Sequence, residues 1–350
     1  MKKTIAIQNR AILKPSSREV AIKEIQNSEI RDELKEKFIK IAQNDTGENI
    51  NLVKKDIGIK EAVYLAKALR ENISLKKINL SWNPLQAEGV CYLAEALKVN
   101  SSLESVILHD VHIGPEGANY LTDMLKVNRS LKEIQLYYNN IGNEGASHFA
   151  DVLTMNSSLE VIELGSDIIG DEGVKHLSDA IKKNRGLRKI ALVANEIGII
   201  GAKAIKEALD VNTLLEEVEI FSNYKIGHDL KMEIGDKVLR NKALNTILKG
   251  SPEEIEEVIG EVQPATAKLW ILEKVEKALE AYLKNIHIDV FSLKFECLKF
   301  ISDAEDGGTL IEQVGFTSKK EAEELTNQII RYEKVKALAR LEMLKQGEQL

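Results

Sequence analysis

Cysteine and aromatic residues are scarce in this chain, and each shortage narrows what the protein can be. Two of the 350 residues are cysteine, Cys91 and Cys297, and no metal-ligand spacing surrounds either. A disulfide framework is therefore excluded, and a reducing, cytoplasmic compartment is the simplest expectation. Aromatic residues make up 5% of the chain, so any place where they gather carries information.

Long apolar runs are also lacking. The first residues, MKKTIAIQNRAILK, turn polar at Gln8, Asn9 and Arg10, so we expect no cleaved signal peptide. Nothing approaches the roughly 20 apolar residues that a membrane span needs. The net charge of −7 disfavours a phosphate-binding surface. We therefore expect neither a membrane span nor a nucleic-acid partner.

An internal repeat dominates the remaining chain. Its units begin 28 residues apart at Leu75, Leu103, Leu131, Leu159, Leu187 and Leu215. The last of these six units, at about 215–244, is fading, and a degenerate unit at about 48–74 precedes them, which makes seven units. Repeats of this length indicate a solenoid in which neighbouring units supply each other's core.

Each unit has two halves with different periodicity. The first half reads LxxIxL, as in Ile134 and Leu136, and apolar residues two apart predict a short strand with one buried face. The second half has apolar residues three and four apart, as in Val174, Leu177 and Ile181, which predicts a helix. Asparagine recurs near each helix end, where we expect a left-handed backbone conformation. These positions are Asn100, Asn128, Asn156, Asn184 and Asn212.

The pattern resembles the leucine-rich repeat family, LxxLxLxxN, and its 28-residue length is similar to the ribonuclease-inhibitor-like subclass. The resemblance covers about 48–244. It implies an α/β fold, a right-handed solenoid with parallel strands on a concave face and helices on the convex face. The family's asparagine, which bonds backbone groups of neighbouring turns, falls at Asn83, Asn139, Asn195 and Asn223, with Asp167 as a near match. Lys55 and Val111 depart from the pattern, so the ladder between turns should be weakest at Val111.

Segments outside the repeat complete the predicted organisation. We expect residues 1–47 to form an N-terminal helical cap and tail and residues 48–244 to form the solenoid. Residues 245–350 are expected to form an all-helical C-terminal domain. Ser251, Pro252 and Glu254 give the boundary near 249–254 the features of a helix start. Residues 278–316 are weakly similar to the PUB domain, which binds tails of AAA+ ATPases, through Asn285–Ile286, Lys294–Phe295 and Gly315–Phe316. An unrelated helical cap or oligomerisation element fits the same segment.

Catalytic and metal sites find little support in the sequence. HDVHIGPEG, at 109–117, groups two histidines and an aspartate, but the repeat places His112 beyond the turn and neighbouring strands supply no third ligand. GDEG and GPEG recur with the repeat and are turns, not phosphate loops. Cys297 has no nucleophile-type partner at the usual spacing, so a buried helical cysteine is the simpler interpretation. We expect no cofactor, no metal and no enzymatic activity.

A binding surface is the remaining candidate site. In the family, positions 3, 5, 7 and 8 of LxxLxLxxN face the concavity. Because parallel strands lie about 4.8 Å apart, residues 28 apart are lateral neighbours. Exposed aromatics are favoured in binding hot spots, although upper-edge aromatics can also pack against the next loop. The predicted partner-binding residues are Trp82, Ile107, His109, Asp110, Tyr137, Tyr138 and Phe221, with Glu163, Glu217 and Glu219 as an acidic end suited to a basic partner.

Three functions compete at this point. The first is a non-enzymatic module whose concave face binds a folded protein partner, as a scaffold, an inhibitor or an effector similar to those that intracellular bacteria deliver into host cells. The second is GTPase activation of the Ran-GAP type, with Arg129, Arg185 or Arg188 near the loops. The third is a C-terminal adaptor for an AAA+ or ubiquitin-pathway partner, or a ligase, which would need Cys297 as a reactive thiol. The identity of the partner and the oligomeric state do not follow from the sequence.

Overall fold

The computed structural model describes residues 17–249, in which strands and helices alternate with the period of the repeat. Two helices come first, α2 (Arg18–Gln26) and α3 (Asp32–Gln43). The strands are β1 (Asn49–Asn51), β2 (Lys77–Asn79), β3 (Ser105–Ile107), β4 (Glu133–Gln135), β5 (Val161–Glu163), β6 (Lys189–Ala191) and β7 (Glu217–Glu219). The helices that follow them are α4 (Ile59–Glu71), α5 (Gln86–Leu97), α6 (Gly114–Leu125), α7 (Gly142–Leu153), α8 (Asp171–Ile181), α9 (Ile199–Val211) and α10 (His228–Lys249).

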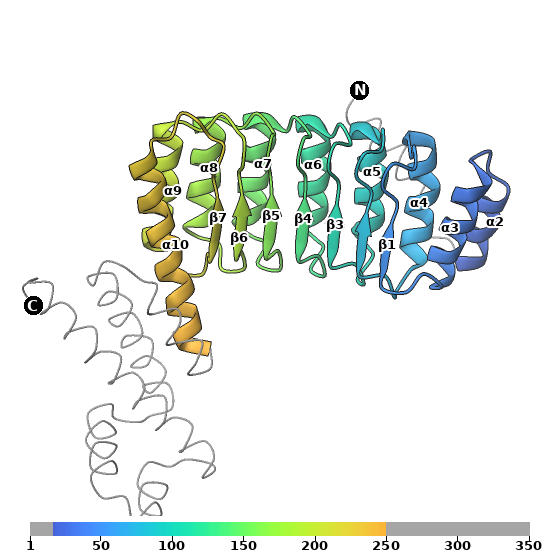
Figure 1. Cartoon of the computed structure of the whole chain (residues 1–350). Helices are drawn as coiled ribbons and strands as arrows, with labels where there is room; N and C mark the ends of the chain where they lie inside the picture. The colour runs from blue at the N-terminus through green and yellow to red at the C-terminus, as the bar shows by residue number, and fades with distance from the viewer. Residues whose placement is uncertain (1–16, 250–350) are drawn as a thin grey trace, which may run out of the picture. The chain divides into compact units, whose positions relative to one another are not determined.

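The strands form one parallel sheet in chain order, β1 to β7 (Figure 1). Each strand residue lies opposite the residue 28 positions later, so Ile78 faces Val106 and Val106 faces Ile134. A slip of one residue would turn every apolar side chain to the opposite face of the sheet. The register therefore confirms the predicted repeat of strand and helix. The right-handed coiling stays a prediction.

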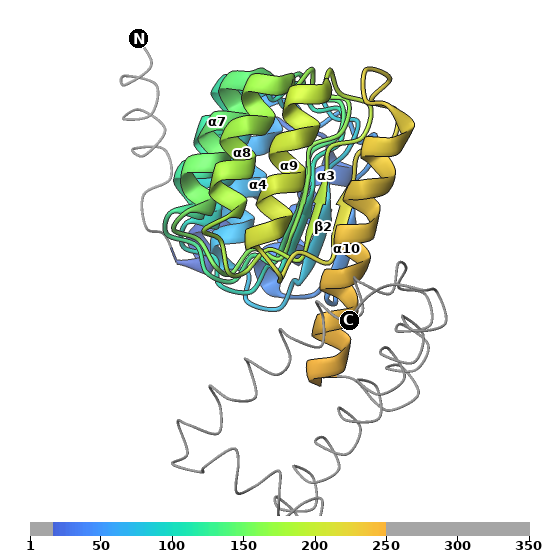
Figure 2. The ribbon, with the colours of Figure 1, turned by 90° about the vertical axis from the view of Figure 1, so that its left-hand side faces the viewer.

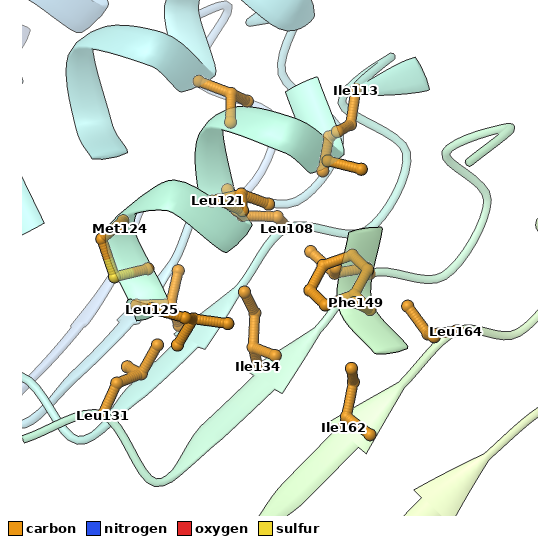
Figure 3. Packing of buried hydrophobic residues seen from close by; sticks show 14 of the residues in the cluster. Leu108, Ile113, Leu121, Met124, Leu125, Leu131, Ile134, Phe149, Ile162 and Leu164 are labelled. Atoms are coloured by element: carbon orange, nitrogen blue, oxygen red, sulfur yellow. The ribbon is translucent and has the colours of Figure 1, made fainter. Parts of the chain in front are cut away.

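Helices α4 to α9 lie along one face of the sheet, as the end-on view in Figure 2 shows. The core fills the space between these two layers. Leu121 and Leu125 of α6 and Phe149 of α7 lie close to Ile134 and Ile162 of the strands (Figure 3), and all five are fully buried. Because this cluster draws on three consecutive units, no unit could bury its apolar face alone. Within residues 17–249, none of the helices α4 to α9 covers the opposite face of the sheet.

The two N-terminal helices pack against the helix of the first unit. Both pack against α4, and the apolar side chains of α3 (Leu34, Phe38 and Ile41) are buried there. Ser17 begins α2 by accepting a hydrogen bond from the Val20 N–H. The cap keeps water from the apolar side of the first repeat.

The asparagines at the helix ends do not act as predicted. None of them has a positive φ; they are buried and link successive units instead. Asn128, for example, donates from Nδ2 to the carbonyls of Leu97 (2.7 Å) and Asn100 (3.1 Å), while its Oδ1 accepts from the Leu131 N–H (2.8 Å). An amide can satisfy carbonyls and N–H groups together. We call the set the helix-end ladder: Asn72, Asn100, Asn128, Asn156, Asn184 and Asn212.

A second row of polar side chains links the turns after the strands. Asn139 accepts from the N–H groups of Val111 (3.0 Å) and Ile113 (3.3 Å) in the preceding unit and donates to the carbonyls of Leu108 and Leu136, both at 2.7 Å. The members of this turn ladder are Asn83, Asn139, Asp167, Asn195 and Asn223.

The turn ladder has a gap at Val111, as predicted. A valine side chain offers no acceptor, so it cannot bond the turn of the unit before it. There the Leu85 N–H turns to the Asn83 carbonyl (2.8 Å), and the Gln86 N–H bonds the Val111 backbone carbonyl (2.9 Å). The units that begin at Leu75 and Leu103 therefore lack the turn-ladder link, although the His109 N–H donates to the Ser81 hydroxyl (3.1 Å) and Lys76 pairs with Glu104 (2.7 Å).

The last described helix closes the repeat region. On α9, Lys206 forms an ion pair with Glu233 of α10, and Asp210 forms one with Lys237. One compact unit of the chain ends at Val238 and a second begins at Leu239. Since α10 runs to Lys249, residue 244 lies within a helix. The C-terminal domain at 245–350, with the PUB-like segment and Cys297, lies almost entirely outside the described residues and stays a prediction. Within residues 17–249, no helix is both long and apolar enough to cross a bilayer.

Candidate functional site: the open face of the sheet

The open face of the sheet is formed by the outward side chains of each strand and of the turn that follows it. Positions 3 and 5 of each unit lie on the strand, and positions 7 and 8 follow it. At position 8 every unit has a positive φ, because the N–H there turns toward the next unit; Trp82, for instance, donates to the His109 carbonyl at 2.8 Å and Tyr138 to the Gly165 carbonyl at 3.0 Å. The backbone of this edge is thus the same in all seven units.

Trp82 and Tyr138 are unusual residues for that backbone. Their φ values are 61° and 63°, a region that favours glycine, asparagine and aspartate and is costly for bulky side chains. Both side chains are nonetheless well exposed, at 50% and 58%. The only ring contact described for Trp82 in residues 17–249 is with the ammonium of Lys54, 5.2 Å from the ring centroid. Neither turn geometry nor core packing accounts for aromatic residues here.

Tyr137 contacts both His109 and Tyr138. The His109 and Tyr137 rings meet edge to face with centroids 5.1 Å apart, and the Tyr137 and Tyr138 centroids are 6.5 Å apart. With Trp82 and Asp110 they form what we call the aromatic patch. Ile107 adds little to it, because only 8% of that residue is exposed.

A hydrogen-bond network fixes the patch from below. His109 Nε2 lies 3.2 Å from Gln135 Oε1, and the Gln135 amide donates to Glu133. Glu133 also accepts from the Ser105 hydroxyl at 2.6 Å and lies 3.6 Å from the Lys77 ammonium. Since Gln135 offers its oxygen, His109 carries a proton on Nε2. Burial lowers the pKa of His109, partly offset by the Gln135 bond, which favours the neutral ring near pH 7.

The ring of Tyr137 packs against Gly165, in the turn after the next strand. A Cβ placed on Gly165 would be 2.0 Å from Tyr137 Cε1, so only glycine accommodates the ring there. Burial raises the pKa of the Tyr137 phenol to about 12, with Glu163 and Glu219 adding to the effect. Packing on the next unit therefore accounts for Tyr137, whereas Tyr138 extends into solvent.

Gly165→Ala should move the Tyr137 ring off the sheet. The new methyl group occupies the space of the ring, so the phenol gains water and its pKa falls from about 12 toward 10. A spectrophotometric tyrosinate titration measures the shift, and Tyr137→Phe identifies the absorbance that belongs to this residue. An unchanged titration in Gly165→Ala would contradict the packing described for Tyr137.

The acidic end contains a lysine that the sequence reading did not include. Lys189 Nζ lies 3.2 Å from Glu163, 3.0 Å from Glu217 and 2.9 Å from Glu219. Burial works against the charge of Lys189, but its bonds to the three carboxylates outweigh this and raise its pKa. Burial also raises the pKa of Glu163, whose side chain is only 11% exposed. Three carboxylates and one ammonium leave this acidic cluster with a formal charge of −2.

Small side chains separate the aromatic patch from Phe221. On the turns after β5 and β6, positions 7 and 8 are Gly165, Ser166, Val193 and Ala194. Phe221 follows β7 and is 58% exposed. Between Tyr138 and Phe221 the face therefore has a low strip two strands wide, and the Tyr137 ring packed over Gly165 forms part of its floor.

Two candidates, a metal site and an arginine finger, are not supported by the described part of the chain. Residues 17–249 hold no group of three or more His, Cys, Asp or Glu side chains that could bind a metal ion. Arg129 and Arg185 fold back onto carbonyls at their own helix ends, and Arg188 lies 3.4 Å from Glu216. These arginines are engaged in the fold, which argues against an arginine finger.

The sequence analysis did not predict three residues of this face, which are Lys189, Gln135 and Gly165. A signal for them existed, because reading positions 3, 5 and 7 down all seven units places Lys189 between Glu163 and Glu217 and Gly165 beside Tyr137. The residues predicted from those positions were aromatic, acidic or, at Ile107, apolar. The contacts that neutralise or fix a side chain were therefore overlooked.

Comparison with known proteins agrees with the repeat. A family model described as Leucine Rich repeat matches residues 71–94 and 127–150. A search of curated proteins found no match. Among solved structures, the fold is similar to leiomodin-1 actin-binding site 2, with 15% identity, a TM-score of 0.31 and coverage of 61% of this chain and 91% of that one. It is also similar to a tropomodulin C-terminal domain from Caenorhabditis elegans, with 15% identity, a TM-score of 0.33 and coverage of 52% and 92%.

The matched segments span a helix end, a strand and the following helix in the same frame as every other unit. The 28-residue register, the parallel strands and the turn ladder are common to all of them. The chain therefore contains leucine-rich repeats, which the family model matches at residues 71–94 and 127–150.

Proposed function

We propose that this protein is a non-enzymatic binding module whose open sheet face binds a folded protein partner. The aromatic patch is the anchor, and the acidic cluster selects the charge of the partner. Leucine-rich repeat domains typically bind proteins, so the proposal also agrees with the family. Such a module acts as a scaffold, or as an inhibitor that covers its partner's working surface.

The observation that carries the proposal is the exposure of Trp82 and Tyr138 at a left-handed backbone position. A residue that is costly there, and that contributes nothing to the core, needs another reason to be present. Trp and Tyr bury a large area on binding with little loss of rotamer freedom, which makes them frequent anchors in interfaces. They are two units apart, roughly 10 Å across the sheet, so one partner surface can cover both.

The predicted result of removing this anchor is loss of the partner. In affinity capture with the full-length protein, Trp82→Ala/Tyr138→Ala should lose at least roughly 90% of a partner that wild type retains, which corresponds to a hot-spot loss of about 2 kcal/mol or more. The control is Val127→Ala/Met155→Ala, because these side chains are just as exposed, at 57% and 61%, but lie at helix ends. If every partner persists in the aromatic double variant, or if the control loses the same one, the proposal is wrong.

A further inference from the structure

We propose that the segment recognised on this face is an amphipathic helix that carries an apolar side chain and a lysine or arginine about two turns apart. The inference rests on the proposed function and specifies the partner's chemistry. It concerns the part of the face between Tyr138 and Phe221, with the acidic cluster below.

The width of the low strip fits a helix. Tyr138 follows β4 and Phe221 follows β7, so three strand spacings of roughly 4.8 Å separate them, about 14 Å in all. An α-helix with its side chains is roughly 10–12 Å wide. Ser166, Val193 and Ala194 between them are small and the Tyr137 ring covers Gly165, so a helix can lie on the floor that these residues form. The exposed rings on both sides would flank its apolar residues.

Charge sets the second requirement. Below the strip, the acidic cluster has a formal charge of −2 after Lys189 is counted. Glu217 is the most accessible carboxylate, with 52% of its side chain exposed. The burial-raised pKa of Glu163 reflects a site that holds its negative charge at a cost, so a second cation would be favoured there. The neighbouring Glu133 already faces Lys77 and does not extend the acidic area.

The distance between strip and cluster sets the spacing on the partner. Positions 3 and 7 of one unit are four residues apart on an extended chain, or roughly 13 Å. A helix rises about 1.5 Å per residue, so residues seven or eight apart on one face span roughly 10–12 Å. An apolar residue at the strip and a basic one at the cluster can therefore belong to one helix lying along the strands.

A peptide titration of the full-length protein tests the inference. The probe is a fluorescein-labelled amphipathic peptide of about 18 leucines and lysines, long enough for roughly five helical turns. A second peptide replaces each lysine by glutamate, and a third carries two central prolines that prevent the helix. The lysine peptide should bind at least tenfold more tightly than either of the others, as measured by fluorescence anisotropy.

Variants locate the binding site. Phe221→Ala should weaken the lysine peptide at least fivefold. Glu217→Lys should weaken it at least tenfold and improve the glutamate peptide. The matched control is Glu172→Lys, which makes the same charge change on the exposed surface of α8 and should alter neither affinity. Circular dichroism of each variant verifies that the repeat fold is intact.

Three results would overturn the inference. Equal binding of the lysine and glutamate peptides removes the charge selection, and equal binding of the proline peptide points to an extended segment. An effect of Glu172→Lys as large as that of Glu217→Lys would reveal only general charge attraction. None of these results alters the capture experiment with Trp82 and Tyr138, because Phe221 and Glu217 are unchanged there. The inference can therefore fail while the proposed function stands.

Discussion

Asp167→Asn should stabilise the protein at pH 8 and leave its stability nearly unchanged at pH 4. Asp167 is the carboxylate of the turn ladder, and it is completely buried. Its Oδ1 accepts the Asn139 N–H at 2.7 Å, but its Oδ2 has no hydrogen-bond partner among the described residues. The asparagines at this position donate Nδ2 to carbonyls 31 and 3 residues earlier, as Asn139 does. An ionised aspartate has no proton to donate there.

The pH dependence follows from the pKa. Burial raises the pKa of Asp167 to about 7, above the value of roughly 3.9 in an unfolded chain. Between these values the folded state binds more protons than the unfolded state, so wild type loses stability as pH rises from about 4 to 7. About three pKa units correspond to roughly 4 kcal/mol. The Asp167→Asn substitution would remove this loss, since an amide is neutral at every pH and supplies the missing donor.

Urea unfolding of both proteins at pH 4 and pH 8 measures the difference. We expect Asp167→Asn to gain roughly 2–4 kcal/mol at pH 8 and less than about 1 kcal/mol at pH 4. Asp56→Asn is the control, because the Asp56 side chain is 81% exposed and should respond little at either pH. An equal gain at both pH values would mean that Asp167 stays ionised when buried.

Asn139→Ala should be strongly destabilising, although Asn139 is polar and lies in a turn. The residue is 1% exposed, and its side chain bonds two N–H groups and two carbonyls of other buried residues. Each buried group that loses its partner costs roughly 1–3 kcal/mol. We expect a loss of about 4 kcal/mol, comparable to truncating a large core side chain.

A second substitution at this position separates the contribution of the amide oxygen, which accepts hydrogen bonds, from that of the amide nitrogen, which donates them. Asn139→Asp keeps the acceptor for Val111 and Ile113 but loses both donors, so its loss should be smaller than that of Asn139→Ala and should grow with pH. Asn119→Ala, on the surface of α6, should change the free energy of unfolding by less than about 0.5 kcal/mol. Equal losses in Asn139→Ala and Asn119→Ala, measured by urea unfolding, would show that the turn ladder is dispensable.

The repeat could be predicted in detail because its signal recurs. Each unit repeats the same strand and helix pattern. Where the pattern in one unit is weak, the stronger patterns in the other units still predict its strand and helix. The register of 28 residues and the position of the aromatic patch follow from that spacing. The helix-end asparagines were misjudged because a single unit suggests a local cap, whereas their partners are carbonyls in the preceding unit.

The candidate site was only partly predictable. Its residues could be located, since position in the unit determines which face a side chain occupies. The exposure of each side chain could not be predicted. Tyr137 packs on Gly165, whereas Tyr138 next to it lies in solvent. Ile107 and Glu163 are largely covered. These outcomes depend on side-chain contacts between units, which a pattern within one unit does not contain.

Because Val111 leaves the turn ladder without an amide between two units, we expect the solenoid to open more readily there than at its other turns. Stability in such an array is a sum of intrinsic terms and nearest-neighbour couplings, and the coupling between the units of Leu75 and Leu103 lacks the contribution of the turn-ladder amide. Trp82 lies on one side of this seam, and Tyr138 lies on the other. A partner that contacts both residues would bind only when these units are packed together, so it would stabilise the interface between them. Binding and the cooperativity of unfolding would therefore be thermodynamically linked at this place in the array.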